Sequence, residues 1–232
     1  MTQRLPAAIL LAGALLLPAA ARAKTPASEA PTRPRNILKI APLGLVHGSM
    51  PFTVESRLSY ERVLGPRSSV AVGASYLGNN PAFSFIGSFA LSAALSSAFT
   101  LAGHPNIVWT ETTIRSRGYR YQAQYRRYLG ARATAPQGWY LSPQVSFSQA
   151  DYTFKLKDFD VQVKLKSTNR NYNLLVGYQR LLGRHLAFDV FTGLGYRDKT
   201  TKSYDSNGAY LKTYPSATKL KISSGLNLGW AF

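Results

Sequence analysis

The sequence contains no cysteine, which excludes disulfide bonds and thiolate metal sites anywhere in the chain. Carboxylates are also scarce, since 10 Asp and Glu residues stand against 28 Lys and Arg. No glycosidase-like acid pair is identifiable, because Glu55 and Glu61 share a strand face but lie about 20 Å apart. No glycine-rich phosphate loop or metal-ligand cluster is present. We therefore expect no cofactor and no metal.

The N-terminal segment lacks acidic residues and carries one early arginine, Arg4, before an apolar core over Leu5–Ala20. An Ala21-Arg22-Ala23 box follows, so residues 1–23 are predicted to be a secretory signal peptide. The alternative, a membrane-anchor helix, is disfavoured because the core is short and ends in small residues. No cysteine follows the predicted cleavage point, so we do not expect a lipoprotein. The Pro-rich residues 24–35 are predicted to be a disordered periplasmic tail.

The formal charge of +18 favours partners with negative charge. Nucleic acid is one such partner, but an exported protein does not meet it, and we expect none. Two explanations of the positive charge remain. The basic residues are solvated in the loops and the lumen, or they contact the phosphates of lipopolysaccharide.

From residue 36 onward, apolar and polar residues alternate with the period of a β-strand. The last eleven residues, ISSGLNLGWAF, place large apolar side chains on one face and small or polar ones on the other. Eight segments of this kind are predicted, at about 36–46, 52–63, 69–78, 118–130 (with a possible start at 112), 139–154, 169–182, 186–198 and 217–232. The stretch 199–219 between the last two is predicted to be a polar loop.

Residues 79–110 break this pattern, and no charged residue occurs from Asn79 to Gly103. The stretch is long enough to span a bilayer as a helix, but its serines and glycines make it only mildly hydrophobic. The pairs Phe85/Phe89 and Leu91/Leu95 have helical spacing. We expect a long extracellular loop, partly helical, resting on the membrane interface, and extra strands remain an alternative.

The connections between the predicted strands differ in length in a regular way. LGPRS, ARATAPQG and GRH are short, whereas the intervening connections are mostly long, as in outer-membrane barrels with short periplasmic turns. A soluble lipocalin-like barrel would place its apolar face inside, but here the second face carries many charges. The prediction is an all-β fold: an eight-stranded antiparallel up-and-down transmembrane β-barrel with long extracellular loops, formed by residues 36–232.

Several strand segments carry a resemblance: NILKIAPLGLVHG, LSYERVLG, GYRYQAQYRRYLG, QGWYLSPQVSFS and LAFDVFTGLGYR. Together they resemble a family of small Bacteroidetes-type outer-membrane β-barrel proteins of unknown function, with OmpA/OmpX-like eight-stranded architecture. The resemblance covers residues 36–232 and implies a fold and a compartment, but no activity. The last strand resembles the C-terminal signal that the barrel-insertion machinery reads, which implies that role for Leu226, Leu228, Trp230 and Phe232.

Two sets of side chains are candidates for function. An eight-stranded barrel is narrow enough for side chains to fill it, so inward-facing charges are expected to pair in a network. This lumen network is predicted to contain Glu55, Arg57, Glu61, Arg120, Arg126, Asp189 and Arg197. The lysines expected in extracellular segments, which lipopolysaccharide phosphates would contact, are Lys155, Lys157, Lys164, Lys166, Lys199, Lys202 and Lys212.

The sequence predicts a monomer in the outer membrane of a Gram-negative bacterium, exported through the Sec pathway. Its expected partners are outer-membrane lipid, lipopolysaccharide and the insertion machinery, and its role is structural, interaction or surface binding with a closed lumen. One alternative is a deacylase-like, lipid-modifying enzyme using His47, with Ser49 and Glu55 nearby. No wider motif supports such a triad, and His104 and His185 are isolated. A narrow solute channel is the other alternative.

Overall fold

The computed structural model describes residues 34–45, 50, 52–103, 111–130, 134–156, 161–215 and 219–232. The predicted signal peptide and nearly all of the predicted tail lie outside these residues. The described strands are β1 (Asn36–Ile40), β2 (Thr53–Gly65), β3 (Ser68–Asn79), β4 (Thr112–Tyr128), β5 (Gly138–Leu156), β6 (Val161–Leu182), β7 (Leu186–Tyr204), β8 (Tyr210–Pro215) and β9 (Leu220–Ala231). The helices are the 3₁₀ turn η1 (Pro42–Leu45) and α2 (Pro81–Leu101).

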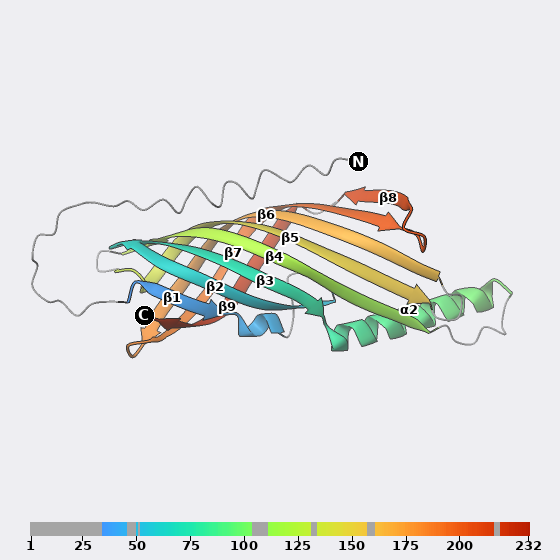
Figure 1. Cartoon of the computed structure of the whole chain (residues 1–232), viewed down its shortest axis with the longest axis horizontal. Coiled ribbons are helices and arrows are strands. Elements are labelled where there is room, and N and C mark those ends of the chain that lie inside the picture. Colours follow the sequence, from blue (N-terminus) through green and yellow to red (C-terminus); the bar gives the residue numbers. More distant parts are fainter. Residues whose placement is uncertain are drawn as a thin grey trace, which may run out of the picture. The chain divides into compact units, whose positions relative to one another are not determined.

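Eight of the described strands close into an antiparallel ring in the order β1-β2-β3-β4-β5-β6-β7-β9, and β9 returns to β1 (Figure 1). β8 lies outside the ring and pairs with the distal end of β7. Ring closure pairs Leu228–Ala231 of β9 with Ile37–Ile40 of β1, and two backbone hydrogen bonds join Phe232 to Asn36 at 2.8 and 3.0 Å. The predicted eight-stranded antiparallel barrel is confirmed.

The two faces of the barrel wall differ in the way that the alternation predicts. Inward-facing residues include many buried polar and charged side chains, such as the fully buried Glu61 and Asp189. A buried apolar cluster of Met50, Leu77, Ala150 and Tyr152 lies among them. Outward-facing residues are large and apolar, and Ile222 is 71% and Trp230 57% exposed. The backbones of β6 and β7 approach closely at Gly193, where an added Cβ would clash with the Leu174 carbonyl oxygen. The outside is therefore apolar, whereas the inside is mostly polar and charged, with one apolar cluster that includes Leu77 of β3 and Tyr152 of β5.

The predicted first strand, 36–46, is too long, because β1 ends at Ile40 and η1 follows. Pro42 has no N–H to continue a strand ladder. Gly44 lies so close to β2 that a Cβ there would be 2.4 Å from the Glu55 carbonyl oxygen. The backbone therefore turns across the wall instead of extending along it.

The predicted polar loop 199–219 is also wrong in part, because β7 runs on to Tyr204 and β8 pairs back along it. The turn between them is closed by Asp205, whose side chain accepts a hydrogen bond from Ala209 N at 2.7 Å, and by Gly208 at a φ of 80°. The last strand starts at Leu220 rather than 217, and residues 216–218 lie outside the described part of the chain.

The predicted helical character of residues 79–110 is confirmed by α2, whose first turn is capped by the Asn80 side chain with Pro81 directly after it. α2 is long and apolar enough to cross a membrane, judged by length and composition alone. However, β3 and β4 are antiparallel neighbours, so the end of β3 and the start of β4 share one end of the barrel. Ser92 Oγ lies 2.8 Å from Thr112 Oγ1, so α2 passes this same end.

Candidate functional site

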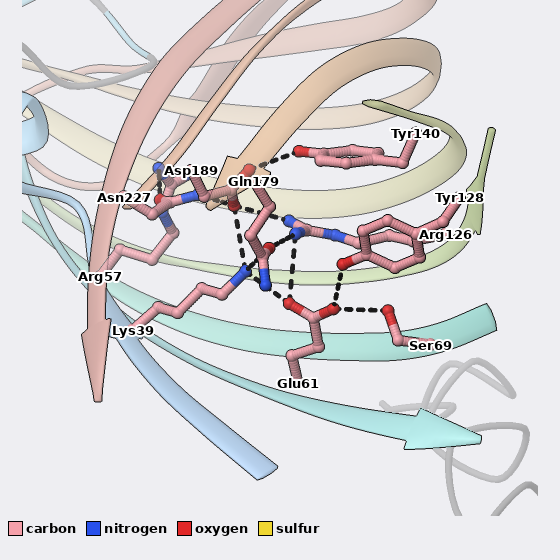
Figure 2. A network of polar contacts seen from close by, with 10 residues as sticks. All are labelled: Lys39, Arg57, Glu61, Ser69, Arg126, Tyr128, Tyr140, Gln179, Asp189 and Asn227. Carbon is pink, nitrogen blue, oxygen red and sulfur yellow. Dashed lines mark hydrogen bonds and ion pairs between the residues drawn. The ribbon is translucent and has the colours of Figure 1, made fainter. Parts of the chain in front are cut away.

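The charges inside the barrel fall into two groups, and the first lies near the short connections. We call it the short-turn cluster, formed by Lys39, Glu61, Arg126 and Asp189 (Figure 2). These side chains come from β1, β2, β4 and β7, so they meet only because the sheet closes into a ring. All four are at most 2% exposed.

The ion pairs of this cluster are short and mutually shared. Lys39 Nζ lies 2.5 Å from Glu61 Oε2 and 3.1 Å from Asp189 Oδ2. Arg126 reaches the same two carboxylates at 3.2 and 2.9 Å. Two cations thus face two anions, and Gln179 Oε1 accepts hydrogen bonds from Lys39 Nζ and Arg126 Nη1, both at 2.6 Å. The cluster is electrically balanced, which offsets the cost of burying its charges.

Neutral donors satisfy the remaining carboxylate positions. Tyr128 Oη donates to Glu61 at 2.8 Å, and Tyr140 Oη donates to Asp189 at 2.6 Å (Figure 2). Asn227 Nδ2 adds a hydrogen bond to Asp189 at 2.9 Å, and the Arg126 guanidinium lies 4.4 Å from the Tyr140 ring centroid. Because these groups are engaged with one another, the arrangement is suited to filling the lumen.

The second group lies further from the short connections, and we call it the mid-barrel cluster: Glu55, Arg57, Arg120 and Lys221. Arg120 Nη1 lies 3.3 Å from Glu55 Oε2, and Arg57 Nη1 lies 3.9 Å from Glu55 Oε1. Ser75 also donates to Glu55 at 2.8 Å. Three basic residues here surround one carboxylate, so this part of the lumen is positively charged. A cavity of about 580 Å³ adjoins it, bounded by η1, β2 and β9.

The two clusters bring together six of the seven residues predicted for the lumen network. The seventh, Arg197, also faces the lumen, but its Nε has no hydrogen-bond partner among the described residues. The sequence reasoning missed Lys39, Tyr128, Tyr140, Gln179 and Asn227 as members of the network. The alternation does place Lys39 on the face opposite the exposed Leu38 and Ile40, and this pattern could have identified Lys39 as inward-facing.

The lysines predicted to face lipopolysaccharide do not form one surface. Lys164, Lys166 and Lys202 are exposed, and Lys166 and Lys202 are direct cross-strand partners on β6 and β7. Lys155 and Lys212 are exposed on β5 and β8, whereas Lys199 has inward-facing register and is half-buried. Lys157 lies outside the described residues.

The remaining predicted residues lie as follows. Leu226, Leu228, Trp230 and Phe232 share the outer face of the last strand and its end. His47, Ser49 and His104, which the enzyme hypothesis would use, lie outside the described residues. His185 is exposed in the turn between β6 and β7, with Nδ1 2.9 Å from the Ala231 carbonyl oxygen and its ring stacked on Trp230. Within the described part of the chain, no group of three acidic or histidine side chains is placed to hold a metal ion.

Comparisons with known proteins bear on the fold. No protein-family model matches the sequence, and no curated protein matches it, so the resemblance to a Bacteroidetes-type family stays a prediction. Among solved structures, the chain is similar to a major outer membrane protein from Thermus thermophilus. The match has a TM-score of 0.54 and 9% sequence identity, and it covers 85% of this chain and 99% of the other. This protein therefore has the fold of an outer-membrane barrel protein.

Proposed function

We propose that the protein is inserted in the outer membrane as a barrel with a plugged lumen, and that it serves in surface binding or membrane organisation rather than in solute conduction or catalysis. The observation that carries this proposal is the reversed polarity of the barrel. Polar and charged residues outnumber apolar ones among the described buried residues, while large apolar side chains are exposed on the outside.

The outer face supports immersion in lipid. Exposed large apolar or aromatic side chains occur on each strand of the ring, including Leu38, Leu58, Val72, Tyr76, Tyr121, Trp139, Val145, Tyr172, Leu174, Leu194, Ile222 and Trp230. Soluble monomers rarely expose contiguous apolar patches beyond a few hundred Å². A transmembrane barrel instead turns an apolar band with aromatic girdles toward lipid.

Helix α2 gives independent support, because it buries serines and exposes phenylalanines, the reverse of a surface helix in a soluble protein. Its buried residues are Ser84, Ser92 and Ser96, and Ser92 contacts Thr112. Its exposed side includes Phe85 and Phe89. A helix in water would bury its phenylalanines and expose its serines. Lipid or the membrane interface around the extracellular end of the barrel is the environment that suits this arrangement.

The plugged lumen disfavours the channel alternative. The short-turn cluster joins β1, β2, β4 and β7 across the interior through ion pairs of 2.5–3.2 Å. Opening a path through it would leave buried charges without partners, at a cost of several kcal/mol.

The surface role rests on the basic extracellular extension. Lys164, Lys166 and Lys202 lie together on the outer face of β6 and β7 beyond the apolar band. Basic clusters of this kind hold lipid phosphates. We propose lipopolysaccharide phosphates as their partners, and a monomer as the functional unit. The alternative, a deacylase-like enzyme using His47, would be detected by assaying lipid A deacylation with His47→Ala as the control.

The decisive experiment is fractionation of cells expressing the full chain. The protein is expected to be exported, to extract with the outer membrane only in detergent, and to migrate differently on a gel before and after boiling. Recovery as a soluble protein without detergent would overturn the proposal. For the surface role, the triple variant Lys164→Gln, Lys166→Gln, Lys202→Gln should bind lipopolysaccharide more weakly. Unchanged binding would refute the proposed contact with lipopolysaccharide phosphates.

A further inference from the structure

The barrel wall is discontinuous at one place, between β9 and β2. Because β1 ends at Ile40, it pairs with β9 only over Leu228–Ala231. Within the described residues, the first half of β9, Leu220–Asn227, has β7 on one side and no hydrogen-bonded strand on the other. The turn η1 fills this position and packs tightly on β2 at Gly44. Among the described residues, the wall is closed here by the packing of η1 and not by strand pairing.

The cavity of about 580 Å³ lies at this discontinuity, and its lining includes residues from both faces of the wall. Its inward-facing lining includes Arg57, Arg120 and Lys221. Its other lining includes Leu43, Ile222 and Leu226, of which Leu43 and Ile222 are exposed on the outer surface. The volume is within the range of about 300–1,000 Å³ that is usual for small-molecule sites. One end of the cavity is therefore cationic and the other apolar.

The charges at the inner end are not balanced, in contrast to the short-turn cluster. Glu55 is the one acidic side chain among the described residues of the lining, and it contacts both Arg57 and Arg120. Lys221 has no hydrogen bond or ion pair with a described residue. Its electrostatic surroundings include the cations of Arg120 and Arg197 as well as Glu55. A carboxylate or phosphate at this position would gain charge-assisted hydrogen bonds and relieve repulsion among the cations.

We propose that this cavity binds a single-chain amphiphile with an anionic headgroup, taken laterally from the membrane between η1 and β9. The headgroup lies at Arg57, Arg120 and Lys221, and the alkyl chain lies along the outer residues of the opening. A free inorganic anion would fit the cations but would leave the apolar end empty. The inference rests on the proposed insertion of the barrel in a membrane.

The test uses the full mature chain in nanodiscs of phosphatidylcholine, with radiolabelled dodecanoate as the probe. Saturable binding of one dodecanoate per barrel is expected, and Lys221→Gln should weaken it about tenfold, as expected for loss of about 1.4 kcal/mol of a charged contact. Lys221 makes no pair with a described residue, so this variant should fold normally. The matched control is Lys219→Gln, because Lys219 is exposed over the Tyr196 ring and does not line the cavity.

Two further measurements separate the headgroup from the chain. Dodecanol, which has the same chain without the charge, should bind at least about tenfold more weakly than dodecanoate, and excess inorganic phosphate should not displace dodecanoate. Filling the cavity with Ser223→Phe should abolish binding. Equal binding of dodecanol, full affinity in Lys221→Gln, or displacement by phosphate would each overturn the inference. A barrel that inserts, shown by heat-modifiable migration, yet binds no dodecanoate would refute this inference alone, whereas failure to insert would refute the proposed function.

Discussion

At the scale of single residues, the feature that distinguishes this protein is a set of ion-paired side chains buried inside the barrel. Glu61 and Asp189 each contact both Lys39 and Arg126, and each accepts a tyrosine hydroxyl. Such groups stabilise a fold only as a set, since removing one leaves its partners charged and buried.

We therefore predict that Glu61→Gln lowers the free energy of unfolding by about 3 kcal/mol, because Lys39 and Arg126 would then share Asp189 alone. The measurement is denaturant unfolding in phospholipid vesicles, followed by tryptophan fluorescence. Asp198→Asn is the matched control, because Asp198 is exposed on the outer face of β7. A loss no larger than that of the control would show that the short-turn cluster does not stabilise the barrel.

At the scale of elements, α2 and the alternating strands follow the same rule: the polar side faces protein and the apolar side faces outward. In α2, Ser96 is buried while Phe89 is 58% exposed. The helix begins where β3 ends, and its Ser92 contacts Thr112 at the start of β4, so α2 lies at that end of the barrel.

The absence of cysteine allows a direct test of this orientation with single labels. A nitroxide attached to Phe89→Cys should collide more readily with oxygen, which partitions into lipid, than with a water-soluble nickel chelate. Ser96→Cys is the control, because its side chain is buried and both reagents should reach it poorly. Preferential collision of the Phe89 label with the nickel chelate would place α2 in water.

At the scale of the whole molecule, the ring contains a neutral plug near its short connections and a cationic cavity further along, beside the discontinuity in the wall. The plug has equal numbers of positive and negative side chains and is buried, whereas the cavity has an excess of positive side chains and is lined in part by exposed residues. The plug supports a barrel that does not conduct, while the cavity offers a lateral route that does not pass through the plug.

Accordingly, the reconstituted protein should give no stable unitary currents in planar bilayers at high salt. A porin reconstituted in the same way would serve as the positive control for insertion and detection. Reproducible single-channel steps from this barrel would contradict the plug and support the channel alternative.

The local pattern of the chain was enough to assign the face that each strand residue takes. Strand alternation is a local property, so the inward position of Glu55, Glu61 and Asp189 could be predicted without knowing their neighbours. The eight-strand ring followed from counting such segments. The sequence could not show which charged residues pair with one another, because Lys39 and Asp189 are 150 residues apart and meet only when the ring closes.

The place where the wall is incomplete, in contrast, depends on tertiary packing. The alternation continues past Ile40, so the sequence predicted a strand to residue 46, but the packing of Gly44 against Glu55 turns the chain across the wall. Among the described residues, no strand pairs with the first half of β9 beside that turn, and Lys221 lies near Arg120. Local pattern thus fixed the faces of the strands, whereas long-range packing fixed the charge clusters and the opening, because both depend on segments brought together only by the closed barrel.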